Sequence, residues 1–153
     1  MGITIYIDAD ACPVRQESYR VAERHQTPVI IVSNSYLRIP KHPLFSGVIV
    51  DDSFDAADDY IAERANNLSV VITADILLAQ RCLMAGARVL APNGKAFDNN
   101  SIGSAIAARA IMADLRAGAE QPNLGGPAPF SAKDRSRFLE ALHLALERLK
   151  RGK

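Results

Sequence analysis

Short apolar runs alternate with polar, helix-forming segments in the first two-thirds of the chain. The runs that predict buried strands lie at residues 3–7, 29–32, 48–50, 70–73 and 88–90. Continuous apolar runs of this length are typical of parallel strands that are covered on both faces. Helices are predicted between most of them: one at 14–25, one that ends near residue 65 and one at 76–85. This alternation predicts a three-layer α/β fold around a doubly wound, mainly parallel, five-stranded sheet.

The other segments predict a loop, a connector and two further helices. Residues 36–47 contain two prolines and no helical period, so we expect a loop there, and 101–116 predict an alanine-rich helix. Residues 118–129 hold three glycines and three prolines, a composition that suits a lid but favours a flexible connector. Ser131 and Asp134 then have the spacing of a capping box. We expect one domain, 1–153, in which a connector at 118–130 leads to an added C-terminal helix at 131–150.

The composition is that of a soluble globular protein, with 48% hydrophobic and 23% charged residues in a chain of 153. No apolar run approaches the ~20 residues that span a bilayer, so we expect no membrane association. Cys12 and Cys82 are too few for a metal cage. Because no signal peptide is recognisable, we expect both to be reduced thiols in a cytoplasmic protein.

Charge is distributed unevenly, although the net charge is only +1. Residues 1–100 carry 12 acids and 9 bases, whereas residues 101–153 carry 5 acids and 9 bases. An acidic body suits cations, and a basic C-terminal third suits phosphates. A solvated, charged helix explains the same pattern, so charge alone does not identify a partner.

Asp8 and Asp10 follow the first predicted strand and precede Pro13, which favours the first turn of a helix. In extended backbone, side chains two residues apart project to the same side. Two carboxylates would then meet at the carboxyl end of a strand, where open α/β sheets bind their ligands. Either acid alone is explained as a strand end or a helix cap. Like charges so close repel unless a cation or a proton lies between them, and the pair therefore favours a cation site.

Further acids lie near other strand ends. Asp55 and Asp58, three residues apart, share one face of the helix after the third strand, although part of this acidity suits a helix start. Asp75 follows the fourth strand, where a single Asp is usually a helix cap. Carboxylate-only sites favour Mg²⁺ or Mn²⁺, which activate water and stabilise the charge on a reacting phosphodiester. The acids together indicate phosphoryl transfer or hydrolysis.

Hydroxyl, amide and basic side chains near the same strand ends are candidates for binding a substrate. Ser33 and Asn34 follow the second strand and Thr73 ends the fourth, although an ordinary turn also explains the first two. Arg38 and Lys95 lie in predicted loops. We expect them, with basic residues of the last helix, to steer the phosphates of a nucleic acid.

Five segments of the chain resemble a single family of bacterial proteins. They are I-Y-I-D-A-D-A-C-P-V (5–14), V-S-N-S (32–35), F-D-A-A-D-D-Y-I (54–61), V-I-T-A-D-I-L-L-A (71–79) and N-L-G-G-P (123–127). Through them the chain resembles the YaiI/YqxD family over nearly its whole length, and D-A-D-A-C-P is specific to that family. Leu77 is a departure, because the family often has proline there. That difference affects a helix start and leaves the acids in place.

The YaiI/YqxD family in turn resembles PIN-like nucleases. The resemblance implies a PIN-like fold and hydrolysis of phosphodiester bonds, in single-stranded RNA, with Mg²⁺ or Mn²⁺ as cofactor. The residues that match the acids of such a site are Asp8 with Asp10, then Asp55 or Asp58, and then Asp75. Asp8, Asp10 and Asp75 would bind metal, and one acid of the helix would complete the shell or orient water. Asp98 lies near the place of a fourth acid, where the family often has an uncharged residue.

Two other functions also fit the sequence. Asp8 and Asp10 resemble the nucleophile and acid/base pair of haloacid-dehalogenase-like phosphotransferases, with Ser33 at the phosphate and Lys41 as a weak candidate for their lysine. A non-catalytic RNA-binding module would keep the acidic pocket and the basic tail without turnover. A fluoroberyllate adduct at Asp8 would support the phosphotransferase. RNA binding that survives every acid-to-amide change would support the module.

Overall fold

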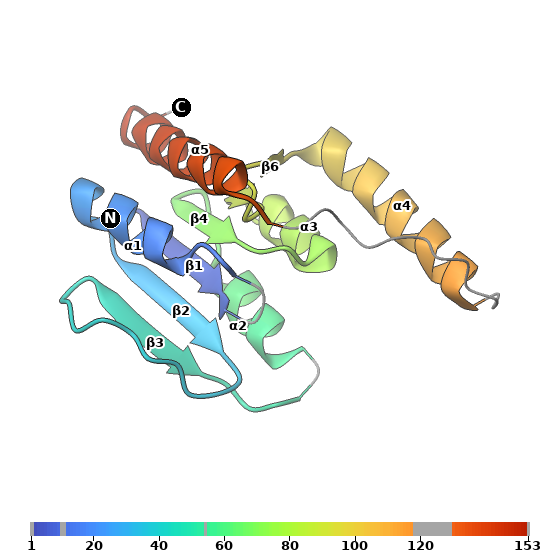
Figure 1. Ribbon diagram of the computed structural model, residues 1–153, viewed down its shortest axis with the longest axis horizontal. Helices are drawn as coiled ribbons and strands as arrows, with labels where there is room; N and C mark the ends of the chain where they lie inside the picture. The colour runs from blue at the N-terminus through green and yellow to red at the C-terminus, as the bar shows by residue number, and fades with distance from the viewer. Residues whose placement is uncertain (1, 10–11, 54, 118–129, 153) are drawn as a thin grey trace.

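One six-stranded sheet forms the centre of the computed structural model, which describes residues 2–9, 12–53, 55–117 and 130–152. The strands are β1 (Thr4–Asp8), β2 (Val29–Ser33), β3 (Phe45–Ile49), β4 (Ser69–Ile72), β5 (Arg88–Leu90) and β6 (Ala96–Phe97). They lie in the order β3-β2-β1-β4-β5-β6 (Figure 1). All neighbours pair in parallel except β5 and β6, which are antiparallel. The mainly parallel α/β sheet predicted from the sequence is confirmed.

Helices cover both faces of this sheet. They are α1 (Arg15–His25), α2 (Ala56–Arg64), α3 (Ile76–Met84), α4 (Asn99–Ala117) and α5 (Ala132–Lys150). One buried cluster joins α1 and α5 to Ile5 and Ile7 of β1. A second joins α2, α3 and the start of α4 to Tyr6 of the same strand. Because successive side chains of a strand point to opposite faces, the two clusters lie on opposite faces of the sheet and give three layers.

The prediction of five strands was wrong, and the third strand begins earlier than predicted. β3 starts inside the predicted loop, and only Phe45 of its five residues is buried. An edge strand with exposed Ser46 and Gly47 has no continuous apolar run at its start, which is why the pattern missed it. β6 has two residues and pairs with β5 after a short turn. So short a strand gives no periodic signal.

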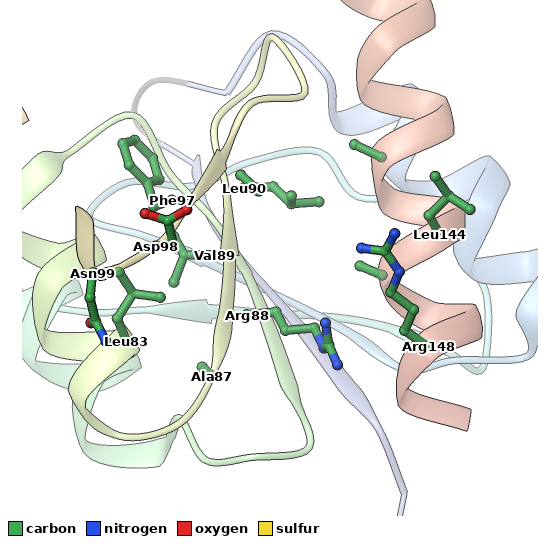
Figure 2. Close-up of a pocket in the computed structure, with 13 residues that line it drawn as sticks. Leu83, Ala87, Arg88, Val89, Leu90, Phe97, Asp98, Asn99, Leu144 and Arg148 are labelled. Atoms are coloured by element: carbon green, nitrogen blue, oxygen red, sulfur yellow. The ribbon is translucent and has the colours of Figure 1, made fainter. Parts of the chain in front are cut away.

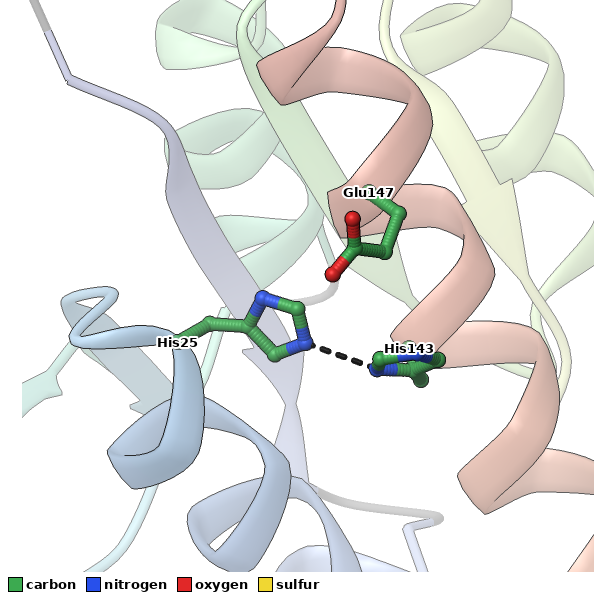
Figure 3. A group of neighbouring side chains, drawn as sticks. All are labelled: His25, His143 and Glu147. Atoms are coloured by element: carbon green, nitrogen blue, oxygen red, sulfur yellow. Dashed lines mark hydrogen bonds between the residues drawn. The ribbon is translucent and has the colours of Figure 1, made fainter.

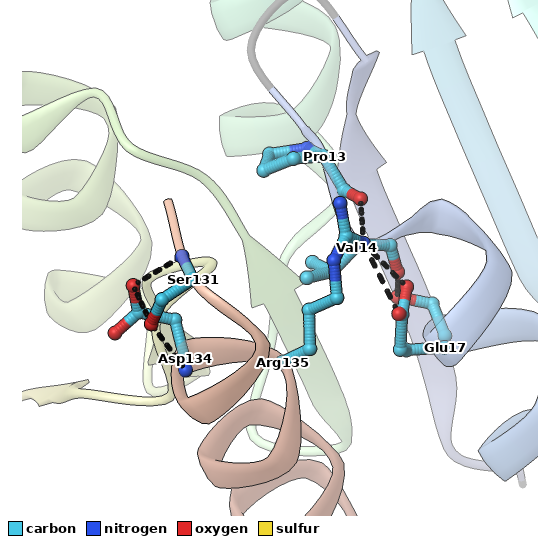
Figure 4. Close-up of polar contacts among 7 residues, drawn as sticks. Pro13, Val14, Glu17, Ser131, Asp134 and Arg135 are labelled. Atoms are coloured by element: carbon cyan, nitrogen blue, oxygen red, sulfur yellow. Dashed lines mark hydrogen bonds and ion pairs between the residues drawn. The ribbon is translucent and has the colours of Figure 1, made fainter. Parts of the chain in front are cut away.

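The C-terminal helix α5 begins and packs as its sequence predicts. Ser131 Oγ accepts a hydrogen bond from the Asp134 N–H, and Asp134 Oδ2 accepts one from the Ser131 N–H, which completes the capping box (Figure 4). Phe138, Leu142 and Leu146 are fully buried along one face of α5. The connector predicted at 118–130 lies, except for its last residue, outside the described residues. Within the part described, every helix is either too short or too polar to cross a membrane.

Candidate functional site

The carboxyl ends of β1 and β4 place Asp8 beside Thr73. The two strands are parallel and Ile7 pairs with Ile72, so the residues that follow this pair meet at one edge of the sheet. Thr73 Oγ1 donates a hydrogen bond to Asp8 Oδ2 at 2.9 Å. Asp8 is 7% exposed and Thr73 1% exposed. The threonine hydroxyl therefore fixes one carboxylate oxygen of Asp8 in a largely dry environment.

Asp75 is joined to the same hydroxyl and caps α3. The Asp75 N–H donates to Thr73 Oγ1 at 3.0 Å, so Thr73 links Asp8 to the start of the helix. Asp75 Oδ1 accepts hydrogen bonds from the backbone N–H groups of Leu77 at 2.9 Å and Leu78 at 3.1 Å. The capping role considered from the sequence is thus present. Asp75 Oδ2 accepts no hydrogen bond from any described residue, so the cap does not exclude a second role for this carboxylate.

Asp58 of α2 is influenced by the negative charges of both Asp8 and Asp75. The pKa of its carboxyl is raised from 3.8 to about 6, first by burial and then by the negative charges of Asp75 and Asp8. Asp55 adds a smaller contribution in the same direction. Acids from β1, α2 and the start of α3, far apart in sequence, therefore act on one another at the carboxyl edge of the sheet. Such a group binds a proton or a cation readily.

The choice between Asp55 and Asp58 follows from the position of each on α2. Asp55 is the N-cap residue, is exposed, and makes no capping hydrogen bond through its side chain. Asp59, the next residue after Asp58, is directed elsewhere, because its Oδ1 pairs with Arg81 Nη1 at 2.8 Å. Asp58 is half-buried, and the charges of Asp8 and Asp75 raise the pKa of its carboxyl. Its burial and its raised pKa favour Asp58 over Asp55 as the acid contributed by α2.

Asp10 and Asp98 are the two other acids considered from the sequence. Asp10 lies outside the described residues. Asp98 precedes α4, where its Oδ1 accepts a hydrogen bond from the Ser101 N–H at 2.7 Å. This backbone bond is the main reason that the pKa of Asp98 is lowered. Asp98 also lines a pocket of about 390 Å³ between the β5–β6 hairpin and α5, with Arg88 and Arg148 across it (Figure 2).

The predicted substrate-binding residues come from the ends of β2 and β4 and from two loops, one before β3 and one between β5 and β6. Ser33 is buried at the end of β2, and its Oγ accepts a hydrogen bond from the Ser35 N–H at 3.1 Å. Asn34 is exposed directly beside it. Arg38 and Lys95 are exposed, and neither forms an ion pair with a described residue. Lys95 closes the turn after β5, where its carbonyl accepts from the Ala91 N–H at 2.9 Å.

Arg135 of α5 is a residue at this edge that the sequence did not single out. Its Nη1 donates to the Pro13 carbonyl oxygen at 2.8 Å and pairs with Glu17 Oε2 at 3.1 Å (Figure 4). These contacts anchor the start of α5 to the start of α1, a few residues after Asp8. The partners are 118 and 122 positions away in the chain, so no local pattern could reveal them. The basic start of the last helix is therefore on the same side as the acids.

The arrangement can bind cations and exchange protons, but it offers no reactive thiol. Burial raises the pKa of Cys12 to about 11 and that of Cys82 to about 12, so both are protonated near neutral pH. The carboxylate oxygens of Asp8, Asp58 and Asp75 are the hard ligands that Mg²⁺ and Mn²⁺ prefer. The described aspartates alone are not a group of three ligands already close enough to hold an ion.

The fold and these acids define an α/β protein with an acidic site at the carboxyl edge of a parallel sheet. The family described as "Uncharacterized BCR, YaiI/YqxD family" matches residues 6–148, and the chain belongs to it, as its motifs predicted. A "UPF0178 protein" of Sphingopyxis alaskensis is 66% identical over 97% of this chain and 96% of its own length. One from Nitrobacter winogradskyi is 54% identical over 99% and 95% of the two chains. No solved structure matches the chain significantly.

Proposed function

We propose that this protein is a PIN-like nuclease that uses Mg²⁺ or Mn²⁺ to hydrolyse phosphodiester bonds in single-stranded RNA. The observation that carries the proposal is the raised pKa of Asp58, which burial first and then the negative charges of Asp75 and Asp8 bring to about 6. Repulsion among partly buried carboxylates lowers stability, and perturbed pKa values of this kind are concentrated at functional sites. The order of the acids, after β1, on α2 and after β4, is the order that supports a PIN-like assignment.

Each residue has a role in this proposal. Asp8 and Asp75, with Asp10, hold the metal through carboxylate oxygens, and the Thr73 hydroxyl keeps Asp8 in place. Bound Mg²⁺ or Mn²⁺ would supply the positive charge that stabilises a reacting phosphodiester and acidifies water. Asp58, with a pKa near the working pH, takes the proton of the attacking water. A base with this pKa is largely deprotonated at neutral pH and still accepts a proton readily.

Exposed basic residues of two loops and of the start of α5 would bind the RNA backbone. Lys95 and Arg38 are exposed and form no ion pair with the residues that the structure describes. Lys133 lies in the first turn of α5, which Arg135 anchors beside Pro13. Each phosphate that such residues neutralise releases counterions, so we expect RNA binding to weaken steeply as salt is added. Binding that is insensitive to salt would exclude this steering role.

The position of Lys41 favours the nuclease over the phosphotransferase. A phosphotransferase would require a lysine at the carboxyl edge, beside Asp8. Lys41 precedes His42, whose Nε2 pairs with Glu23 Oε1 at 3.1 Å near the end of α1. Leu44, directly before β3, accepts a hydrogen bond through its carbonyl from the N–H of Val29, the first residue of β2, at 2.8 Å. Lys41 therefore lies in a segment that is tied to the amino edge of the sheet.

Cleavage of a labelled single-stranded RNA, measured in Mn²⁺ and in EDTA, tests the proposal. We expect cleavage only with the metal, and a loss of roughly 100-fold or more in Asp58→Asn, which removes the proton acceptor. Asp8→Asn should also abolish cleavage. Asp59→Asn is the matched control, because it lies on the same helix but pairs with Arg81. It should retain full activity.

Three results would contradict the nuclease. Equal cleavage by the parent and Asp58→Asn would show that the acids are not the site. RNA binding without cleavage, unchanged in Asp8→Asn and Asp58→Asn, would identify a binding module. Formation of an aspartyl-fluoroberyllate adduct at Asp8 would identify a phosphotransferase.

A further inference from the structure

Three metal-ligating side chains meet at the opposite edge of the sheet, where α1 packs against α5. His25 is the last residue of α1 and directly precedes the turn into β2, whereas His143 and Glu147, four residues apart, share one face of α5 (Figure 3). One nitrogen from each histidine and one Glu147 oxygen lie within 4.8 Å of one another. Among the described residues, no other group of three His, Cys, Asp or Glu side chains is arranged to hold a metal ion.

The hydrogen bonds of His25 show which of its two ring nitrogens carries the proton. Lys150 Nζ lies 2.7 Å from His25 Nδ1, and His25 Nε2 lies 2.9 Å from His143 Nδ1. A protonated lysine can only donate, so Nδ1 accepts from it and Nε2 carries the ring proton. Nε2 then donates to His143 Nδ1. In the metal-free protein, one proton therefore lies between the two facing nitrogens.

We propose that His25, His143 and Glu147 form a binding site for a divalent transition metal ion of the Zn²⁺ class, which joins α5 to α1. Two imidazoles and a carboxylate are a common donor set for such ions. Ligands 2.0–2.1 Å from a tetrahedral Zn²⁺ are ~3.3 Å apart from one another. The facing nitrogens at 2.9 Å, and the three donors within 4.8 Å, reach this spacing by small side-chain rotations.

The three residues differ in their exposure to solvent. His25 is buried, whereas His143 and Glu147 are half-buried on the outer helix. His143 also lines a pocket of about 340 Å³, together with Arg20 and Arg24. Of the three residues only His143 lines this pocket, so solvent reaches the proposed site from the side of His143, past the two arginines.

Lys150 competes with the ion for this site. A metal on His25 Nε2 needs the lone pair of that nitrogen, so the ring proton moves to Nδ1. Nδ1 can then no longer accept from Lys150, and the exposed lysine must withdraw. Its ammonium also repels a cation, as do Arg24 and Arg151, the latter 3.8 Å from Glu147 Oε2. Removing the Lys150 charge should therefore strengthen metal binding.

Titration of the metal-free full chain with Zn²⁺ tests the site directly. In ¹H–¹⁵N spectra of the histidine rings, we expect the signals of His25 and His143 to shift with one equivalent of Zn²⁺. The only other histidine of the chain, His42, should not shift. Competition with a chromophoric chelator should show binding that is weaker by at least about tenfold in His143→Ala and Glu147→Gln. Lys150→Met should bind Zn²⁺ more tightly than the parent, and His42→Ala equally.

Each contrary result overturns part or all of the proposal. If the ring signals of His25 and His143 stay unchanged, or His143→Ala binds Zn²⁺ as well as the parent, the three residues form a hydrogen-bond network and no metal site. If Lys150→Met binds more weakly, ligation through His25 Nε2 is wrong. Equal losses in His42→Ala and His143→Ala would show that Zn²⁺ binds elsewhere.

Discussion

Replacing Asp58 with asparagine should stabilise the metal-free protein at neutral pH and leave its stability nearly unchanged in acid. The pKa of Asp58 is raised from 3.8 to about 6, so between these values the folded protein holds a proton that the unfolded chain has released. The stability that this proton confers is fully present below pH 3.8 and is lost as the pH rises through about 6. Asparagine cannot ionise, so the variant keeps the uncharged state at every pH.

The size of the effect follows from the pKa difference and the exposure of the side chain. A shift from 3.8 to about 6 corresponds to an upper limit of roughly 3 kcal/mol in the free energy of unfolding. Asp58 is only half-buried, and screening by solvent reduces this to about 1 kcal/mol. For a chain of 153 residues, such a gain raises the Tm by ~2–4 °C.

Thermal melts in EDTA, repeated from about pH 4 to about pH 8, measure the effect. The difference in Tm between Asp58→Asn and the parent should be close to zero in acid and should grow as Asp58 ionises in the parent. Asp59→Asn is the control, because its carboxylate pairs with Arg81 and its loss should cost up to ~1 kcal/mol. A gain that does not depend on pH, or an equal gain in Asp59→Asn, would refute the reasoning.

Three further substitutions test the contacts around the acids. Asp75→Asn should keep the cap of α3. Its free energy of unfolding in EDTA should rise by ~0.5–1 kcal/mol because one repulsive charge is lost. Adding Mn²⁺ should then raise its Tm less than that of the parent. A variant less stable in EDTA, with the full Mn²⁺ effect, would exclude Asp75 from the site. Thr73→Val should lower the free energy of unfolding in urea by about 1–3 kcal/mol because the buried hydrogen bond from Thr73 to Asp8 is lost, whereas Thr73→Ser should cost less. Arg135→Gln should lower the free energy of unfolding by ~1 kcal/mol or less, and the backbone amides of α5 should exchange their hydrogens faster than in the parent. Unchanged amide exchange would mean that the pairing of Arg135 with Glu17 does not anchor the helix.

Most strands, and the places of Asp8 and Asp75 at strand ends, could be predicted because each signal is local. An apolar run followed by an aspartate marks Asp8 at the end of β1 and Asp75 after β4, whatever the rest of the chain does. The capping box of α5 is another local signal, carried by two residues three positions apart. β3 was missed at its start because an edge strand does not need a continuous apolar run.

The rest depends on contacts between elements that are distant in sequence. Asp55 and Asp58 share a helix face in the sequence, and only the packing of α2 on the sheet brings Asp58 under the influence of Asp8 and Asp75. The pairing of His25 with His143 joins residues 118 positions apart. No periodicity or spacing encodes such a pair, because it is created when α5 packs against α1.

The central claim is that the carboxyl edge of the sheet binds a divalent metal through the carboxylates of Asp8 and Asp75, with Asp58 beside the ion as the proton acceptor. Anomalous diffraction from crystals soaked in Mn²⁺ tests it most directly, because the scattering of the ion locates it independently of activity. We predict a peak within bonding distance of carboxylate oxygens of Asp8 and Asp75, absent from crystals of Asp75→Asn. Well-diffracting soaked crystals with no peak at this edge would contradict the account.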